Sequence, residues 1–194
     1  MLTSGAVLTG GRSHRMGTDK ALLMLGSGTM VEHMVETLEA AVDVVRLVGG
    51  AIEHPRAATV EDRYPDEGPL GGVISALHGS DADVTVLVGC DLPRLTPAVV
   101  STLIETVSTT GADYAVPIIG GRRQWHCVAW DTRCVGQLGD MFDSGVRSFL
   151  PAVEGMQESA VLLAESHIFD DLDTPEDYEQ YLSSQTEAGR RAHR

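Results

Sequence analysis

The chain has 194 residues, of which 43% are hydrophobic and 22% charged, ordinary values for a globular domain that exclude a largely disordered chain. Fourteen basic residues against 28 acidic ones give a formal net charge of −14, which argues against an extended nucleic-acid or anionic membrane interface. No stretch is apolar enough to span a bilayer and no signal peptide is evident, so we expect a cytoplasmic protein. Cys90, Cys127 and Cys134 lack a metal-type spacing and are predicted to be buried thiols.

Strands and helices are predicted to alternate through the first hundred residues. In chain order we expect a strand at 6–8, a helix at 30–41, a strand at 44–48, a helix from Pro69 to about Gly79, a strand at 84–88, and a helix from the Thr96-Pro97 cap to about Thr106. Such alternation predicts an α/β fold, with a mostly parallel sheet covered by helices on both faces. Ligands of these folds bind beyond the carboxyl ends of the strands.

The second half of the chain is predicted to add two strands and a C-terminal helix. The expected elements are strands at 113–118 and 125–130 around a Gly120-Gly121 turn, helical segments at 131–138 and 146–153, and a helix opened by Thr174-Pro175. We therefore predict a single domain over residues 1–182. The polar and aperiodic segment 183–194 is expected to be a disordered tail.

The segment Leu8–Lys20, LTGGRSHRMGTDK, carries the strongest chemical signal. Gly10 and Gly11 follow a predicted strand, where backbone N–H groups can converge on anionic oxygens without a β-carbon in the way. The same loop supplies two cations and a hydroxyl donor, namely Arg15, Lys20 and Ser13. Its spacing is neither the dinucleotide fingerprint nor the Walker loop. A basic glycine loop without a ligand is the competing interpretation, and the density of phosphate-suited groups favours phosphate binding.

Carboxylates at a strand end and in two loops are candidate ligands. Asp91 follows the predicted strand at 84–88 and is suited to holding Mg²⁺ through its hard oxygens, although aspartates also cap turns at such positions. Its place opposite the phosphate loop favours the metal, with Asp171 or Asp173 as an alternative second ligand. Helix capping and solvation explain most of the Asp170, Asp171 and Asp173 cluster without any ligand. Asp62 lies in an acidic loop before Gly68-Pro69, where a solvated surface position and a nucleotide contact both remain open.

Several of these segments resemble motifs of the nucleotidyltransferase family that includes molybdenum cofactor guanylyltransferase. Leu8–Lys20 resembles the signature LAGGxSxRMGxDK, with Thr9 in place of the usual alanine. Five further segments resemble GPLAG, CDxP, QPLxAxY, GxRS and N-x-NTPED in the family order: residues 68–72, 90–93, 124–130, 145–148 and 171–177. The series covers about residues 5–182.

This resemblance implies a Rossmann-like three-layer αβα fold and the transfer of GMP from GTP to Mo-molybdopterin, with release of pyrophosphate and formation of the guanine dinucleotide cofactor. It also implies nucleotide contacts at Leu8, Thr9, Gly10, Lys20, Asp62 and Asp91, with Mg²⁺ at Asp91. Arg15, Lys20 and Asp91 are then the expected catalytic residues. Molybdoenzymes or their chaperones are the expected partners.

Two alternatives remain open. The first is a cytidylyl- or other nucleotidyltransferase that acts on a different phosphorylated acceptor, since Asp171 and Asp173 stand where guanylyltransferases often have asparagines. The order of Asp19 and Lys20 favours the guanylyl branch. The second is a non-catalytic nucleotide-binding module, which the presence of both Lys20 and Asp91 disfavours.

Overall fold

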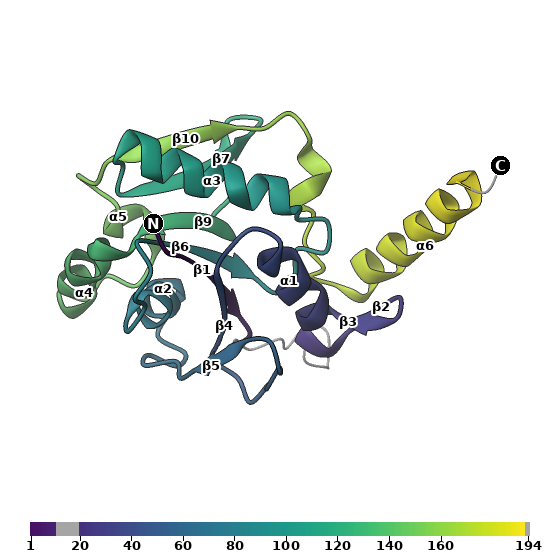
Figure 1. The fold of residues 1–194 in the computed structure, drawn as a ribbon, viewed down its shortest axis with the longest axis horizontal. Helices are drawn as coiled ribbons and strands as arrows, with labels where there is room; N and C mark the ends of the chain where they lie inside the picture. Colours follow the sequence, from purple (N-terminus) through teal and green to yellow (C-terminus); the bar gives the residue numbers. More distant parts are fainter. Residues whose placement is uncertain (11–19, 193–194) are drawn as a thin grey trace.

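The computed structural model describes residues 1–10 and 20–192, with side chains as far as residue 185. Its main sheet has eight strands in the order β10-β7-β9-β6-β1-β4-β5, and β8 pairs with β7 (Figure 1). The strands are β1 (Thr3–Leu8), β4 (Val44–Val48), β5 (Ala58–Val60), β6 (Val84–Gly89), β7 (Tyr114–Ile119), β8 (Arg122–Arg123), β9 (Cys127–Asp131) and β10 (Glu158–Leu162). A separate hairpin pairs β2 (Met24–Leu25) with β3 (Gly28–Thr29).

The sheet is mostly parallel, as the alternating pattern predicts. β6, β1, β4 and β5 run in one direction, and β10 is parallel to β7. β9 is antiparallel to both of its neighbours, β6 and β7. Consequently β9 begins where β6 ends, and the N–H of Gly89 donates a hydrogen bond of 2.8 Å to the carbonyl of His126. The turn before β9 therefore lies at the same edge as the carboxyl end of β6.

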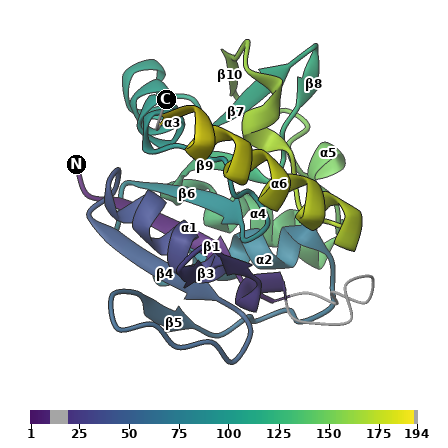
Figure 2. The same cartoon turned by 90° about the vertical axis from the view of Figure 1, so that its right-hand side faces the viewer.

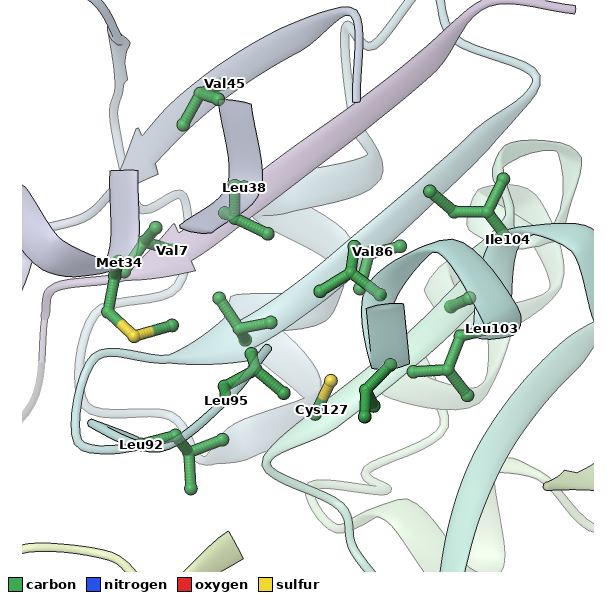
Figure 3. Close-up of a cluster of buried hydrophobic side chains, with 14 of the residues drawn as sticks. Val7, Met34, Leu38, Val45, Val86, Leu92, Leu95, Leu103, Ile104 and Cys127 are labelled. Carbon is green, nitrogen blue, oxygen red and sulfur yellow. The ribbon is translucent and has the colours of Figure 1, made fainter. Parts of the chain in front are cut away.

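Helices cover both faces of this sheet, so the expected three-layer αβα architecture is confirmed. The α-helices are α1 (Met30–Glu39), α2 (Pro69–Leu77), α3 (Pro97–Thr110), α4 (Val135–Asp143), α5 (Phe149–Ala152) and α6 (Pro175–Ala192), and the 3-10 helices are η1 (Lys20–Leu22), η2 (Thr132–Cys134) and η3 (Ser166–Phe169). α1 and α3 pack on one face in a cluster that includes Met34, Leu38 and Leu103 (Figure 3). α2, α4 and α5 pack on the other face around Trp130.

Side-chain alternation explains how one strand serves both cores. Cys127 and Ala129 of β9 belong to the cluster under α1 and α3, whereas Val128 and Trp130 belong to the opposite cluster. All four side chains are 0% exposed. β9 is thus buried on both faces, which accounts for its continuous apolar sequence.

Several predicted boundaries need adjustment. β9 begins at Cys127 instead of residue 125, because residues 124–126 turn and the N–H of Cys127 donates to the carbonyl of Gln124 at 3.2 Å. α3 continues past Thr106 to Thr110, where Gly111 ends the helix at φ +69°. The strands β5 and β10 and the β2–β3 hairpin were not predicted.

The C-terminal segment differs most from expectation. α6 continues through Ser183 to Ala192, where the sequence predicts a disordered tail. No proline interrupts this segment, and Tyr181 is 7% exposed in a small third core with Met30 and Leu172. Figure 1 shows α6 extending away from the body of the molecule, and Figure 2 shows it in front of the sheet. Within the described residues, no helix combines the length and apolarity needed to cross a membrane.

Candidate functional site

The chain leaving β1 is tied to the chain leaving β4 at the carboxyl edge of the sheet. The N–H of Thr9 donates to the carbonyl of Val48 at 3.0 Å, and the Thr9 hydroxyl donates to the carbonyl of Gly49 at 2.5 Å. The Thr9 side chain is buried, so these bonds are protected from water. The threonine therefore fixes the start of the glycine loop to the neighbouring strand end.

A second glycine pair faces Gly10 across this edge. Gly49 and Gly50 have φ values of +75° and +70°, which favour glycine. A Cβ built on Gly49 would lie 3.2 Å from both the N and the Cα of Gly10, so the two backbones are in contact. This pair follows the buried strand β4 just as Gly10-Gly11 follows β1. This repeated pattern of a strand followed by two glycines is the sequence signal that could have identified Gly49 and Gly50 as part of the site.

Asp62 lies beside the same glycines. Its Cβ is 3.5 Å from the position that a Cβ on Gly49 would take. Its Oδ1 accepts hydrogen bonds from the Tyr64 N–H at 3.0 Å and the Ser75 hydroxyl at 2.9 Å. The carboxylate is therefore held in a fixed position at the edge of the sheet, and its role as a nucleotide contact stays a prediction. The structure places Leu8 here too, at the end of β1.

The Gly68–Gly72 and Gly145–Ser148 motifs pack against each other. A Cβ on Gly68, whose φ is +94°, would lie 2.9 Å from the carbonyl oxygen of Arg147. That carbonyl accepts a hydrogen bond from the Leu70 N–H at 3.2 Å. The Arg147 guanidinium lies 3.7 Å from the ring centroid of Phe142 and pairs with Glu67 at 3.0 Å. These contacts position the start of α2 near the site without giving either motif a catalytic group.

Asp91 occupies the end of the central strand β6. Its Oδ2 lies 3.6 Å from the Lys20 ammonium, and its side chain is 15% exposed. Its Oδ1 is buried and has no hydrogen-bond partner in the described part of the chain. A Cβ on Gly89 would approach this oxygen to 2.6 Å, so a larger residue at position 89 would displace the Asp91 carboxylate. Burying a carboxylate oxygen without a partner costs folding free energy. Such an oxygen is suited to coordinating a bound cation, which would supply the missing partner.

Residues 171–177, which we call the closing segment, bring Asp171 and Asp173 close to Asp91. The N–H of Leu172 donates to the carbonyl of Asp91 at 3.1 Å, which sets the segment against the end of β6. Asp173 accepts a hydrogen bond from the Lys20 ammonium. Burial raises the pKa of Asp171, and the charges of Asp173 and Asp91 raise it further. Residues separated by 153 positions thus form one charged cluster.

Lys20 lies between two of these carboxylates and is 13% exposed. Burial by itself lowers the pKa of Lys20, but the hydrogen bond to Asp173 and the charge of Asp91 outweigh it, so the pKa is raised overall. Lys20 is therefore charged at neutral pH. Of the predicted phosphate-binding groups, Gly11, Ser13 and Arg15 lie outside the described residues.

The donor set fits a cation that receives much of its coordination from substrate. Among the residues whose placement is described, no group of three or more His, Cys, Asp or Glu side chains is arranged to hold a metal. Mg²⁺ commonly uses one or two carboxylates together with phosphate oxygens and water. Asp91 meets that requirement because its buried Oδ1 has no hydrogen-bond partner in the described residues, and Asp171 or Asp173 lies nearby.

The lysine and the strand-end carboxylates suit a nucleotide phosphate with its cation, and on a mostly parallel three-layer fold the class of protein that they support is a nucleotidyltransferase. Comparison with known families makes this specific. Residues 5–158 match the MobA-like NTP transferase domain, and the chain belongs to that family.

A named relative agrees with this assignment, and solved structures share the fold. A Bacillus mycoides protein named probable molybdenum cofactor guanylyltransferase is 33% identical over 156 residues, covering 75% of this chain and 76% of the relative. Molybdopterin-guanine dinucleotide biosynthesis protein A from Archaeoglobus fulgidus has a similar fold, with a TM-score of 0.78, 19% identity, and coverage of 94% and 99%. A Mycobacterium tuberculosis protein in complex with manganese has a TM-score of 0.68 at 20% identity, with coverage of 95% and 100%.

Proposed function

We propose that this protein is a molybdenum cofactor guanylyltransferase that transfers GMP from GTP to Mo-molybdopterin. The names of its relatives support this activity. The observation that carries the proposal is the buried Oδ1 of Asp91, which has no hydrogen-bond partner among the described residues and lies next to the Lys20 ammonium, at the same sheet edge as the glycine pairs. A metal-bound polyphosphate would supply a cation to the Asp91 oxygen and anionic oxygens to the Lys20 ammonium.

The reaction joins two phosphate groups. A terminal phosphate oxygen of the acceptor attacks the α-phosphorus of GTP, and the bond from that phosphorus to the pyrophosphate oxygen breaks. The attacking phosphate is already ionised at neutral pH, so no side chain has to remove a proton. Positioning and charge neutralisation then supply most of the rate enhancement.

The residues divide this work by their chemistry. Asp91 would hold Mg²⁺, which supplies positive charge to phosphate oxygens when bound. Lys20 neutralises charge on the β- and γ-phosphates, together with Arg15. Backbone N–H groups of the Gly10 loop orient the phosphates, and Asp62 contacts the nucleotide.

The cellular setting is part of the proposal. Burial raises the pKa of Cys127 and of Cys134 to about 12, so neither thiol is ionised at neutral pH. Inert and buried thiols suit the reducing cytoplasm, where the protein would receive GTP and Mo-molybdopterin. Molybdoenzymes or their chaperones would then take the product.

Nucleotide preference is the sharpest test. Calorimetry with GTP, CTP, ATP and UTP in Mg²⁺ should show GTP binding most tightly, and pyrophosphate release should require Mo-molybdopterin. Tighter binding of CTP would instead favour the cytidylyl alternative. Mn²⁺ serves as a second metal in the same titrations, because a solved relative in fold is a manganese complex.

A further inference from the structure

The phosphate-binding lysine of the proposed function already has a protein partner. Lys20 donates a hydrogen bond to Asp173 and lies 3.6 Å from the Asp91 carboxylate. Its side chain is 13% exposed, so few water molecules compete for the ammonium. The ammonium has three N–H donors, and a phosphate oxygen that approaches Lys20 competes with Asp173 for the donor that this carboxylate now occupies.

Asp173 is the carboxylate that can be exchanged, because Asp91 approaches Lys20 less closely and has a second oxygen suited to a cation. Asp173 is 39% exposed and lies at the rim of the cluster. After the contact with Lys20 is lost, the exposed part of this carboxylate stays in contact with water. Solvation thus lowers the cost of releasing Asp173, whereas the same release from a buried carboxylate would be expensive.

The backbone around Asp173 is held on both sides. Leu172 is 1% exposed, and its N–H is bonded to the carbonyl of Asp91. Thr174 caps α6, and both its N–H and its hydroxyl donate to Asp177, at 2.8 and 2.7 Å. Lys20 is the more adaptable partner because four carbons separate its ammonium from the backbone. In an exchange the lysine head moves and the aspartate stays.

We propose that Asp173 is an internal competitor for the phosphate subsite, which holds the Lys20 ammonium at the end of β6 and yields it to a polyphosphate. The inference deepens the proposed function and rests on the assignment of Lys20 to phosphate binding. Asp173 is a positioning residue in this scheme. Its carboxylate prepares Lys20 in a charged and oriented state, at the cost of weaker polyphosphate binding.

The exchange favours ligands with several charges. Asp91, Asp171 and Asp173 surround one lysine, so the described cluster carries a net negative charge when all four groups are ionised. A single phosphate group gains little by displacing a carboxylate of similar character. A polyphosphate can displace it because its neighbouring oxygens bind other groups of the site at the same time.

Calorimetry in EDTA tests the competition without any contribution from a metal. The probes are inorganic tripolyphosphate and GTP, and the variants are Asp173→Asn and Asp171→Asn. Asp173→Asn should bind both probes about tenfold more tightly, because the carboxylate that competes for a charge-assisted hydrogen bond is gone. Asp171→Asn removes the same charge from the same segment without freeing Lys20, and its gain should stay below about threefold. Equal gains in the two variants, or no gain in either, would overturn the proposal.

A second background isolates the lysine. In Lys20→Gln, the substitution Asp173→Asn should tighten tripolyphosphate binding by less than about threefold, which is the general effect of removing one charge, and a gain that stays at about tenfold would contradict the exchange. Thermal unfolding checks that each variant is folded, and Asp173→Ser replaces Asp173→Asn if the amide variant is not. Tripolyphosphate has no base, so its result is independent of guanine recognition. A tripolyphosphate gain together with equal GTP and CTP affinities would keep the competition and reject the guanylyl assignment.

Discussion

The two sides of the carboxyl edge are built in opposite ways. On the β1–β4 side, Gly10 and Gly49 lack side chains, and their backbones touch. On the β6 side, Lys20, Asp91 and Asp173 form a cluster of charged side chains. The first side is assembled by neighbouring parallel strands, whereas the second depends on a segment from the C-terminal part of the chain. Substitutions should therefore act through steric exclusion on one side and through charge on the other.

The charged side is tested most severely by Asp91→Asn. This change keeps the side-chain volume and removes the charge expected to hold Mg²⁺, so pyrophosphate release should fall on the order of 10³-fold, since bound metals contribute several kcal/mol. The melting temperature should change little. Asp140→Asn, an exposed position on α4, is the matched control. Turnover above about a tenth of the wild-type value would remove Asp91 from the reaction.

Lys20→Ala separates phosphate neutralisation from nucleotide binding. Turnover should fall about 10²-fold or more, which is the usual effect of losing one charge-stabilising donor. Binding of GMP should weaken much less than binding of GTP, because GMP lacks the β- and γ-phosphates. Calorimetry with both nucleotides measures the difference. Equal weakening would place Lys20 near the α-phosphate, the sugar or the base.

Gly49→Ala tests steric exclusion on the glycine side. The new Cβ would meet the Gly10 backbone at 3.2 Å at a φ of +75°, so GTP affinity should fall about tenfold as the two loops separate. Gly79→Ala is the control, because Gly79 has a φ of +69° and nothing within 4 Å of its added Cβ. Both variants should lose about 1–2 kcal/mol of stability from backbone strain. If Gly79→Ala also weakens GTP binding, global destabilisation explains the effect.

The smallest effect concerns stability in the closing segment. The folded-state pKa of Asp171 is raised by burial and by its acidic neighbours, so its ionised form costs stability above that pKa. Asp171→Asn should raise the melting temperature at pH 7 by about 1–2 °C, and the gain should disappear as the pH falls below the unfolded pKa. Scanning calorimetry in metal-free buffer at pH 7 and pH 3 measures both values.

Asp177, six residues after Asp171, has a pKa shift of the opposite sign. Hydrogen bonds from the Thr174 side chain and backbone lower its pKa, so its ionised form stabilises the protein above the unfolded pKa. Asp177→Asn should lower the melting temperature at pH 7, and the loss should shrink as the pH falls through the folded pKa. Changes of the same sign in the two variants would show that their effects do not come from these pKa shifts.

The central elements of the fold could be predicted because local signals agree there with tertiary packing. Val44–Val48 and Val84–Gly89 are largely apolar runs, and each pairs with a strand on both sides. Pro69, Pro97 and Pro175 each open a helix. The edge strands β5 and β10 carry weaker signals. Glu158–Leu162 has one buried residue, Val161, and pairs along one side with β7. Its conformation depends on a partner that the local pattern does not reveal.

The candidate site could be predicted as a set of residues but not as a set of contacts. The motifs identified Lys20, Asp91 and Asp173 separately, and the strand end explained why Asp91 faces a ligand. The ion pair between Lys20 and Asp173 could not be predicted, because no periodicity links residues 153 positions apart. The steric need for Gly49 also depends on the spacing between two loops, which becomes visible when β1 and β4 are paired.

The long sequence separation of Lys20 and Asp173 sets the order in which parts of the site can form during synthesis. Asp173 follows Lys20 by 153 positions, which take roughly 8–30 s to synthesise at about 5–20 residues per second. During that interval β1, β4 and β6 can already pair, because Val84–Gly89 is complete long before the closing segment emerges. In a nascent chain, these three strands can therefore pair before Asp173, the carboxylate that holds Lys20, has been synthesised. The charged cluster of the enzyme is therefore completed after the strands that carry its glycine pairs.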